Sequence, residues 1–519
     1  MADITVTCTN DKNVSIAFRW DWDNNPFHLL GLDGIYGYDC NVTTSENTTT
    51  DGSTYQGSTA KERNIVITAE IDGDYRKNRE LLYRVFPKGR TGTLEYSEDG
   101  DIKTITYRVE SVTPGATTGV VRDYTISLIC TDPYFKDLSD VEVVMASWVS
   151  DWYFENGFDI NGVEFGHREA ELVKEIENNN GADNIGITAI FRADGIVKNP
   201  AIYHSESGKY IKVGYAGNDF ELQSGQYVVI FTHTGKKNIY LLGGVSQAEI
   251  EEHKDRYGMI DWETVVSMYG TIINQYLDED GEFIQLQDGT NTLTYTADEG
   301  TNYLSRTAQT PLHTMQKAAL TIYPCPYITA FHIWGCKSME IIVYDRNLYR
   351  LGTIENHTSL QWHRKYYECG TFELHAPATE DNMRLLQPGN VIRPKGKDEA
   401  AVIRGDQTEE ESTLVNEIVR NGYFLPIYFN DRLTGPMFTF NGTCEDAMRY
   451  MINRMAAVPL LEVAPGIGDA TKITFQATYK NVLTYLSKIA RYCELGFRVV
   501  PDFKGKKMTF ETYKGIDRT

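Results

Sequence analysis

Alternating apolar and polar residues recur along most of the chain and predict a protein built mainly from β-strands. In residues 63–71, Ile65 and Ile67 lie two positions apart among polar neighbours, which is the period of a half-buried strand. Two more alternating runs within residues 91–112 flank the turn sequence Glu-Asp-Gly-Asp and predict a hairpin. Residues 74–86 place apolar side chains at helical spacing instead, so we expect one short helix between these strands.

Residues 150–304 contain further alternating runs, separated by Gly- and Asn-rich turns. Short strands at this spacing predict an antiparallel sandwich or barrel. A stretch with helical character at residues 248–277 interrupts the strands and predicts a helical insertion. Residues 167–181 have helical propensity, but the strands around them favour an edge strand, and both alternatives stay open.

From Met339 onward the pattern is again β, with two predicted helices. Residues 445–456 and 481–496 each place apolar side chains on one face, and we expect the second helix to stop at Gly496 through a glycine C-terminal cap. Residues 40–59 are different, because they are rich in Thr, Asn and Gly and lack a hydrophobic period. This composition predicts a long surface loop.

The chain is strongly acidic, and the acidity is confined to its first two thirds. Its 519 residues carry a formal charge of −22, yet residues 339–519 contain 23 basic and 23 acidic residues. The whole excess therefore lies in residues 1–338. Such a balance argues against duplex DNA or an anionic membrane as a partner. The unequal division indicates two separately evolved units.

The connection between these units has an unusual composition. Residues 300–339 contain no Asp or Glu, and residues 318–336 contain no charged residue at all. Pro324 and Pro326 argue against a transmembrane helix in this apolar run. An irregular linker of this length inside a compact protein is itself uncommon.

No catalytic or metal-binding motif stands out, so we predict no enzyme, no cofactor and no metal site. The sequence lacks a Gly-Lys-Ser/Thr phosphate loop, a G-x-S-x-G elbow and an H-E-x-x-H motif. The acidic run at residues 278–282 does not fit the register of an EF-hand and is interpreted as a solvated turn. Cys369 and His363 are better explained as half-buried strand residues than as a nucleophile and its base. The eight cysteines are scattered, which predicts neither a disulfide framework nor a zinc site.

Four aromatic residues are the candidates for binding or interface contacts. They are Tyr134, Trp148, Trp152 and Trp362. Together with Trp334, the tryptophans could form a platform that stacks on a sugar. Aromatic residues of β-sandwiches more often belong to the core or anchor an interface, and we favour that interpretation.

Residues 62–115 and 124–138 resemble the distal tail protein family of long-tailed, non-contractile bacteriophages that infect Gram-positive hosts. Strand, helix, hairpin and a closing Cys-x-Asp-Pro-Tyr-Phe sequence follow the order and spacing of that family. Residues 198–213 and 282–304 resemble its second domain, a galectin-like β-sandwich, although the usual last strand after residue 304 is missing. The resemblance implies a non-catalytic protein that forms a hexameric ring between the tail tube and the adsorption apparatus.

Residues 348–377, 389–403 and 484–519 resemble the N-terminal part of a different tail protein, the tail-tip hub or tail-associated protein. Hub proteins are β-rich, form trimers and plug the tube beneath the distal ring, and this chain stops where the hub family continues. The expected class is mainly β with minor α (α+β). The expected domains are residues 1–139 as a ring-forming β domain, 140–304 as a galectin-like sandwich with its helical insertion at 248–277, 305–338 as an anomalous linker, and 339–519 as a partial tail-hub domain.

One hypothesis explains the missing strand, the acid-free segment and the long linker together. Met339 is then the start codon of a second tail gene, and residues 305–338 are upstream DNA read in a shifted frame. This hypothesis also removes the mismatch between a ring of six and a hub of three in a one-to-one fusion. The alternative is a genuine fusion with a real linker, and the sequence leaves both open.

The sequence therefore predicts a structural component of a bacteriophage or prophage tail tip or baseplate that works by oligomerisation. Expected partners are further copies of itself, the tail tube protein and other baseplate or receptor-binding proteins, with host wall carbohydrate as a further candidate. We expect neither nucleic-acid binding nor membrane insertion. A carbohydrate-binding receptor module is the alternative function, and a cell-wall-degrading enzyme is the third. The polar N-terminus predicts no signal peptide, so we expect assembly in the bacterial host cytoplasm and a final location at the virion tail tip.

Overall fold

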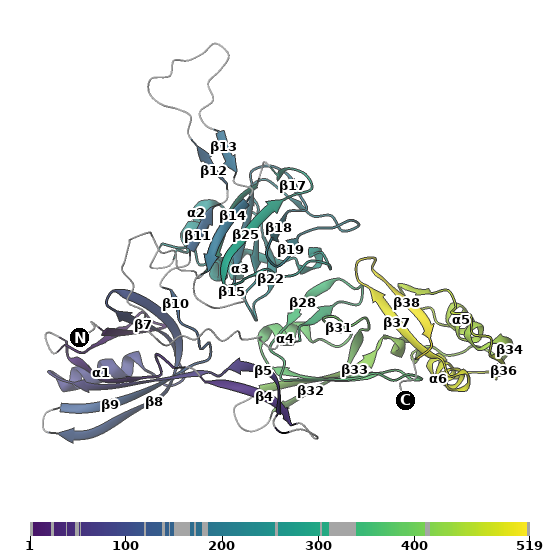
Figure 1. Cartoon of the computed structure of the whole chain (residues 1–519), viewed down its shortest axis with the longest axis horizontal. Coiled ribbons are helices and arrows are strands. Elements are labelled where there is room, and N and C mark those ends of the chain that lie inside the picture. Colours follow the sequence, from purple (N-terminus) through teal and green to yellow (C-terminus); the bar gives the residue numbers. More distant parts are fainter. Residues whose placement is uncertain are drawn as a thin grey trace, which may run out of the picture.

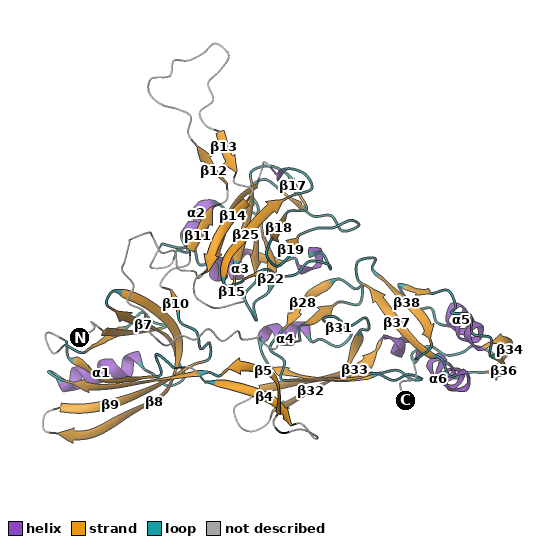
Figure 2. Cartoon of the chain, viewed as in Figure 1, coloured by secondary structure: helices purple, strands orange, loops and turns teal. Residues whose placement is uncertain are grey.

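The chain folds into three lobes that follow one another in sequence, as Figure 1 shows. The computed structural model describes residues 4–21, 25–37, 39–46, 51, 53–118, 121–137, 141–144, 146–149, 167–170, 173–178, 185–254, 258–301, 304–310, 339–410 and 416–515. Strands predominate and helices are few (Figure 2), so the predicted class of mainly β with minor α is confirmed. Of the helices in these ranges, none is long and apolar enough to span a membrane.

The N-terminal lobe is a closed barrel. Within the described residues its strands run in the order β8-β7-β1-β2-β3-β6-β9, and a further pairing of β9 with β8 closes the sheet. The strands are β1 (Ile4–Asn10), β2 (Ser15–Arg19), β3 (Phe27–Asp33), β6 (Arg63–Ile71), β7 (Thr91–Glu98), β8 (Asp101–Thr118) and β9 (Val121–Cys130), with β10 (Lys136–Asp137) added outside β8. The alternation seen in the sequence sets the core, because Ile65 and Ile67 point inward and are fully buried. Closure removes the exposed sheet edges that an open sheet would present.

The predicted helix and hairpin of this lobe are both present. Helix α1 (Tyr75–Val85) buries Leu82 and Val85 and contacts β1, β2 and β6. The turn between β7 and β8 places Asp99 and Gly100 at positive φ, 50° and 93°. Two consecutive residues with φ above zero match the twist of a tight hairpin, and a glycine accepts this backbone without strain.

The prediction of a surface loop at residues 40–59 is wrong. Strands β4 (Cys40–Glu46) and β5 (Ser53–Ala60) pair antiparallel there and form a hairpin that projects from the barrel (Figure 1). Asn41 to Thr44 are exposed. A hairpin whose side chains do not pack on the core shows no hydrophobic period, while its β-branched threonines still favour the extended backbone.

The second lobe is a sandwich of two antiparallel sheets. Its larger sheet runs β11-β26-β16-β21-β22-β23, and its smaller sheet runs β14-β25-β18-β19. The larger sheet consists of β11 (Val141–Val144), β26 (Leu304–Thr310), β16 (Thr188–Ala193), β21 (Tyr227–Phe231), β22 (Asn238–Leu242) and β23 (Gly270–Ile272). The smaller sheet consists of β14 (Val173–Asn178), β25 (Gly289–Thr296), β18 (Ala201–His204) and β19 (Lys209–Lys212). Short pairs β12 (Ala146–Val149) with β13 (His167–Ala170), β15 (Ile185–Gly186) with β24 (Gln285–Leu286), and β17 (Val197–Lys198) with β20 (Glu221–Leu222) complete it.

The insertion at residues 248–277 covers the outer face of the larger sheet. It contains α2 (Gln247–Glu251), α3 (Trp262–Tyr269), the edge strand β23 and the short 3₁₀ helix η1 (Asn274–Tyr276), so it is only partly helical. Strand β21 is buried along its whole length. Val228 and Ile230 belong to the core between the sheets, whereas Val229 packs under the insertion. A strand covered on both faces shows a continuous apolar run instead of alternation, and YVVIF is such a run.

Two further expectations for the sandwich are resolved by its pairing. Residues 167–181, for which a helix and an edge strand were both open, contain strands β13 and β14, and β14 is the edge of the smaller sheet. The prediction that the last strand is missing after residue 304 is wrong, because β26 pairs with β16 on one side and with β11 on the other. Residues 305–310 of the predicted anomalous linker therefore belong to the sandwich sheet, and the rest of that linker lies outside the described residues.

The C-terminal lobe contains one large sheet and a smaller layer with helices. The sheet order is β28-β27-β31-β32-β33-β30-β29. Its strands are β28 (Arg350–Ile354), β27 (Ile341–Tyr344), β31 (Val391–Pro394), β32 (Ala401–Glu410), β33 (Asn416–Phe424), β30 (Thr371–Pro377) and β29 (Ser359–His363), with α4 (Glu380–Leu385) after β30. The smaller layer contains η3 (Leu425–Phe429), β34 (Phe438–Thr443), β35 (Leu461–Val463), β36 (Lys472–Ala477), β37 (Gly496–Asp502), β38 (Lys507–Tyr513), α5 (Cys444–Met455) and α6 (Val482–Cys493).

Both predicted helices of this lobe exist as α5 and α6, which pack against each other. The expected glycine cap is wrong by two residues. Helix α6 ends at Cys493, and Glu494 takes the left-handed conformation with φ of 55°. Gly496 instead begins β37, where a Cβ atom would lie 2.6 Å from the ring of Tyr513. This glycine permits a close approach between neighbours and does not cap the helix.

Candidate functional site

Trp362 is packed into the C-terminal sheet. Its ring lies on β29, with centroids 4.5 Å from Phe424 and 6.0 Å from Phe372. The indole nitrogen is buried and has no hydrogen-bond partner among the described residues. Trp362 therefore contributes to the packing of this sheet, and a binding role for it stays a prediction.

Among the other predicted aromatic residues, the structure describes the side chain of Tyr134. Tyr134 follows β9 and is 61% exposed. Trp148 lies on β12 opposite Arg168 of β13, and nothing of its side chain is described. Trp152 and Trp334 lie outside the described residues. Strands β12 and β29 belong to different sheets.

The one nucleophile considered from the sequence is inert. Cys369 is buried, and its Sγ donates to the carbonyl oxygen of Phe424 at 3.3 Å. Burial raises the pKa of this thiol to about 12, so it stays protonated at neutral pH and is a poor nucleophile. His363 is exposed and contacts Gln361 instead. Within the described ranges, no group of three or more His, Cys, Asp or Glu side chains could hold a metal ion.

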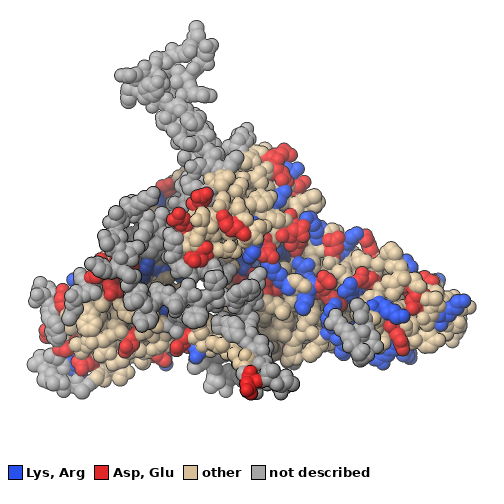
Figure 3. Space-filling view, viewed as in Figure 1, with Lys and Arg blue, Asp and Glu red and all other residues tan. Residues whose placement is uncertain are grey.

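A charged junction joins the sandwich to the C-terminal lobe. We define the junction as Lys237, Asn274, Asp278, Glu279, Asp280, Glu282 and Phe283 of the sandwich with Glu340, Tyr344, Arg350, Glu355, Arg393, Lys395 and Lys504 of the C-terminal lobe. Figure 3 shows acidic and basic side chains interspersed where these two lobes meet.

Lys237 lies at the centre of a buried ion cluster. Its Nζ is 2.7 Å from a carboxylate oxygen of Glu340 and 2.7 Å from one of Glu355, and the side chains of Lys237 and Glu355 are only 5% and 7% exposed. Glu355 also accepts a hydrogen bond from the backbone N–H of Gly235 at 2.7 Å. Burial alone would lower the pKa of Lys237, but the two carboxylates outweigh it and raise that pKa. Lys237 is therefore charged at neutral pH.

Glu340 receives a second cation from its own lobe. Lys395 Nζ lies 3.0 Å from its other carboxylate oxygen. Burial alone would raise the pKa of Glu340, but hydrogen bonds from Lys237 and Lys395 lower it to about 2. The carboxylate of Glu340 is therefore ionised at all but strongly acidic pH.

The acidic run predicted to be a solvated turn is a contact surface. Asp278 and Asp280 face Lys504 at 3.4 and 2.8 Å, and the Asp278 side chain is 10% exposed. The run folds back on itself because the backbone N–H groups of Gly281 and Asp280 donate to the backbone oxygen and side chain of Asp278. This turn directs consecutive carboxylates toward the C-terminal lobe.

The remaining carboxylates of the run each have a partner across the junction. Tyr344 donates its hydroxyl to Glu279 at 2.8 Å, and Glu282 lies 3.1 Å from Lys395. The Tyr344 ring is fully buried and stacks on Phe503 at 3.7 Å between centroids. Aromatic packing of this kind fixes the hydroxyl in place, so the hydrogen bond to Glu279 is preorganised.

A buried amide adds a neutral contact. Asn274 of η1 is 2% exposed and donates to the backbone oxygen of Leu351 on β28 at 2.9 Å. Its side-chain oxygen accepts from the backbone N–H of Ile239 at 2.8 Å, which orients the amide. Nearby, Arg350 lies over the ring of Phe283 at 5.7 Å. Such oriented contacts define one relative placement of the two lobes.

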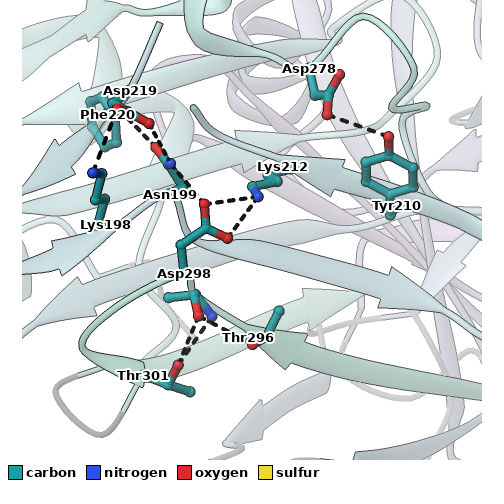
Figure 4. A network of polar contacts seen from close by, with 11 residues as sticks. Lys198, Asn199, Tyr210, Lys212, Asp219, Phe220, Asp278, Thr296, Asp298 and Thr301 are labelled. Carbon is teal, nitrogen blue, oxygen red and sulfur yellow. Dashed lines mark hydrogen bonds and ion pairs between the residues drawn. The ribbon is translucent and has the colours of Figure 1, made fainter. Parts of the chain in front are cut away.

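A polar network inside the sandwich lies next to the acidic turn and contacts Asp278 at its start. Figure 4 shows Asn199 donating to Asp219 and Asp298, both at 2.9 Å, and Lys212 pairing with Asp298 at 2.7 Å. The same view shows the Tyr210 hydroxyl directed at Asp278, at 3.4 Å. The backbone oxygen of Lys212 also accepts from the N–H of Asp278 at 3.0 Å. Strand β19 thus holds the start of the turn.

Sequence reasoning missed this junction, although two signals were present. The acid excess of the first 338 residues was noted, and the basic runs RPKGK (393–397) and KGKK (504–507) lie in the neutral part. Complementary runs of opposite sign are the signature of an interface. The local amino-acid sequence, however, does not show which acidic run contacts which basic run in the fold.

The comparisons with known proteins concern both parts of the chain. Residues 340–519 match the family described as Siphovirus ReqiPepy6 Gp37-like protein. No match is found among the curated proteins. Among solved structures, the chain is similar to Dit (gp 19.1) of phage SPP1, described as a paradigm of the hub adsorption apparatus in phages that infect Gram-positive bacteria. That likeness has 15% identity, a TM-score of 0.37, and coverage of 59% of this chain and 98% of that chain.

Two further solved structures are similar at the same distant level. The phage P2 baseplate in its activated conformation with calcium shares 10% identity at a TM-score of 0.32, covering 60% of this chain and 97% of that chain. Prophage tail protein gp18 from Listeria monocytogenes EGD-e shares 14% identity at a TM-score of 0.26, covering 33% of this chain and 50% of that chain. Likenesses this distant carry no argument of their own. The family match confirms the predicted resemblance of the C-terminal part to a siphovirus protein, because residues 340–519 match the Siphovirus ReqiPepy6 Gp37-like family.

Proposed function

We propose that the chain is a structural component of the tail tip that joins the tail tube to the adsorption apparatus and works by assembling in several copies. The observation that carries this proposal is the match of residues 340–519 to a siphovirus family. In the proposed organisation, residues 1–139 form a ring, residues 140–304 form a galectin-like sandwich that projects outward, and residues 339–519 form a partial hub. The proposed location is the tip of the virion tail.

The proposed role needs surfaces and rigidity but no reacting group. The closed barrel is a rigid unit that can be repeated around a symmetry axis. The junction fixes the C-terminal lobe to the sandwich through buried charges and a buried amide, which suits a part that transmits force and position. Proposed partners are further copies of the chain, the tail tube protein and neighbouring baseplate proteins, with host wall carbohydrate as a candidate ligand of the sandwich.

The mass of the purified chain in solution tests the proposal. We expect a discrete particle of three or six copies of the 58.9 kDa chain at micromolar concentration, because rings and hubs close around a symmetry axis. Mass photometry or light scattering after size exclusion gives this number directly. A monomer at all concentrations, or an open-ended series of aggregates, would contradict assembly as the mode of action.

A further inference from the structure

The junction joins two bodies that each have their own hydrophobic interior. In the described residues, the core clusters of the sandwich contain only residues from 176–304, and those of the C-terminal lobe contain only residues from 341–510. No core cluster spans the junction in these ranges. The contacts described across it are ion pairs, hydrogen bonds and cation–π contacts, and the last include Lys506 over the ring of Tyr215 at 5.5 Å. Polar and charged contacts of this kind are typical of an interface between two folded partners, whereas a shared core is apolar.

The charges across the junction are complementary in a pattern that fixes one register. Glu279 and Glu282 of the sandwich meet Arg393 and Lys395 of the C-terminal lobe. At Lys237 the signs are reversed, because the sandwich supplies the cation and the other lobe supplies both carboxylates. A surface that alternates in sign repels a partner that docks out of register, and interfaces between separate chains obtain specificity in this way.

The junction contacts described above all join residues of the two folded lobes. Strand β26 ends at Thr310, and the described chain resumes at Met339. Every junction residue of the sandwich precedes β26, and every junction residue of the other lobe follows Met339. These contacts therefore belong to the two folded bodies themselves.

We propose that the face of the sandwich formed by Lys237, Asn274 and residues 278–283 is a docking surface for residues 339–519 as a separate polypeptide. The two parts then stay associated without residues 311–338, and the partner is a chain that begins near Met339. This inference rests on the geometry of the junction and not on the proposed tail function. It is in accord with the hypothesis that Met339 is a start codon, and it adds the surface through which the two products meet.

Cleavage of the intact chain tests the proposal. A protease recognition site inserted between Pro324 and Cys325 allows the folded protein to be cut after purification. We expect the two fragments to co-elute from size exclusion at about 0.1 M salt, where partly buried pairs are little screened. Lys237→Met should weaken their association by on the order of 100-fold, because it leaves two carboxylates without their shared cation.

Lys236→Met is the matched control for this variant. Lys236 is the same residue type one position earlier, is 58% exposed and pairs with Glu263 inside the sandwich, so its loss should leave the association unchanged. A second variant avoids the buried cluster. Asp280→Lys should weaken the association, and Asp280→Asn should weaken it less, because Lys504 then keeps Asp278 as a partner and meets no second cation.

Three results would overturn the proposal. If the wild-type fragments separate after cleavage while both keep the circular dichroism of folded protein, the junction does not suffice to hold them together. Fragments that unfold on cleavage show that the partner is not a separate folding unit. Co-elution that neither Lys237→Met nor Asp280→Lys weakens shows that another surface holds the parts together. None of these results depends on whether the chain belongs to a tail tip, which the mass measurement addresses.

Discussion

Replacing Lys237 by Met in the intact chain is expected to destabilise the junction by about 3–5 kcal/mol, the range for breaking a buried ion pair by removing one partner. The cause is the uncompensated charge that remains. Glu355 is 7% exposed, and within the described residues Lys237 is the only cation that pairs with it, whereas Glu340 keeps Lys395. Hydrogen exchange at the Gly235 amide reports the effect, because that N–H donates to Glu355. Its exchange should accelerate by on the order of 100- to 1,000-fold.

A triple variant separates charge imbalance from lost packing. Lys237→Met combined with Glu340→Gln and Glu355→Gln leaves no unpaired charge, so we expect it to be far more stable than Lys237→Met alone. Lys236→Met again serves as the control and should exchange like the wild type. If the single and triple variants slow or accelerate exchange to the same degree, the ion cluster does not hold the junction closed.

Replacing Trp262 by Ala is expected to destabilise the sandwich by about 3–5 kcal/mol, the range for removing a buried Trp or Phe side chain. Trp262 is 6% exposed and packs in the cluster between helix α3 and the outer face of the larger sheet, 6.3 Å from the ring of Tyr227. Its indole nitrogen has no partner among the described residues, so the loss comes from the cavity and not from a hydrogen bond. Differential scanning calorimetry measures it as a lower melting temperature.

The control for Trp262 lies on the same helix. Met268 is 60% exposed, and Met268→Ala should change stability by no more than about 0.5 kcal/mol. Equal melting temperatures for Trp262→Ala and the wild type would mean that the insertion does not cover the sheet. That outcome would also remove the explanation given for the continuous apolar run of β21.

The sequence predicted well those elements whose residues face one core and one solvent side. Strand β6 and helices α1, α5 and α6 carry regular periods, and each was expected near its observed position. The prediction for residues 40–59 failed because no alternation of apolar and polar residues marks the β4–β5 hairpin. Thr-rich segments of this kind are typical of loops. The predicted position of the α6 cap was wrong because Glu494 adopts the left-handed conformation that glycine usually takes. A residue keeps such a strained conformation when the surrounding structure requires it.

The junction could not be predicted because it depends on which distant segments meet. The run at residues 278–282 has the composition of a solvated turn, and only the fold shows that Asp278 is nearly covered and faces Lys504. The last sandwich strand was missed for a related reason. Leu304 is a buried core residue, but the strand that it begins is recognised only from its pairing with β11 and β16. Pairing between strands that are far apart in the sequence produces no periodic pattern in the local sequence.

The central claim is that this chain is part of the tail tip, and its position in the phage particle tests that claim most directly. Antibodies raised against residues 339–519 and coupled to gold can be applied to purified particles and imaged by electron microscopy. The account predicts label at the end of the tail distal to the capsid, on intact particles. Label on the capsid or along the tail shaft, or particles that lack the chain altogether, would contradict it.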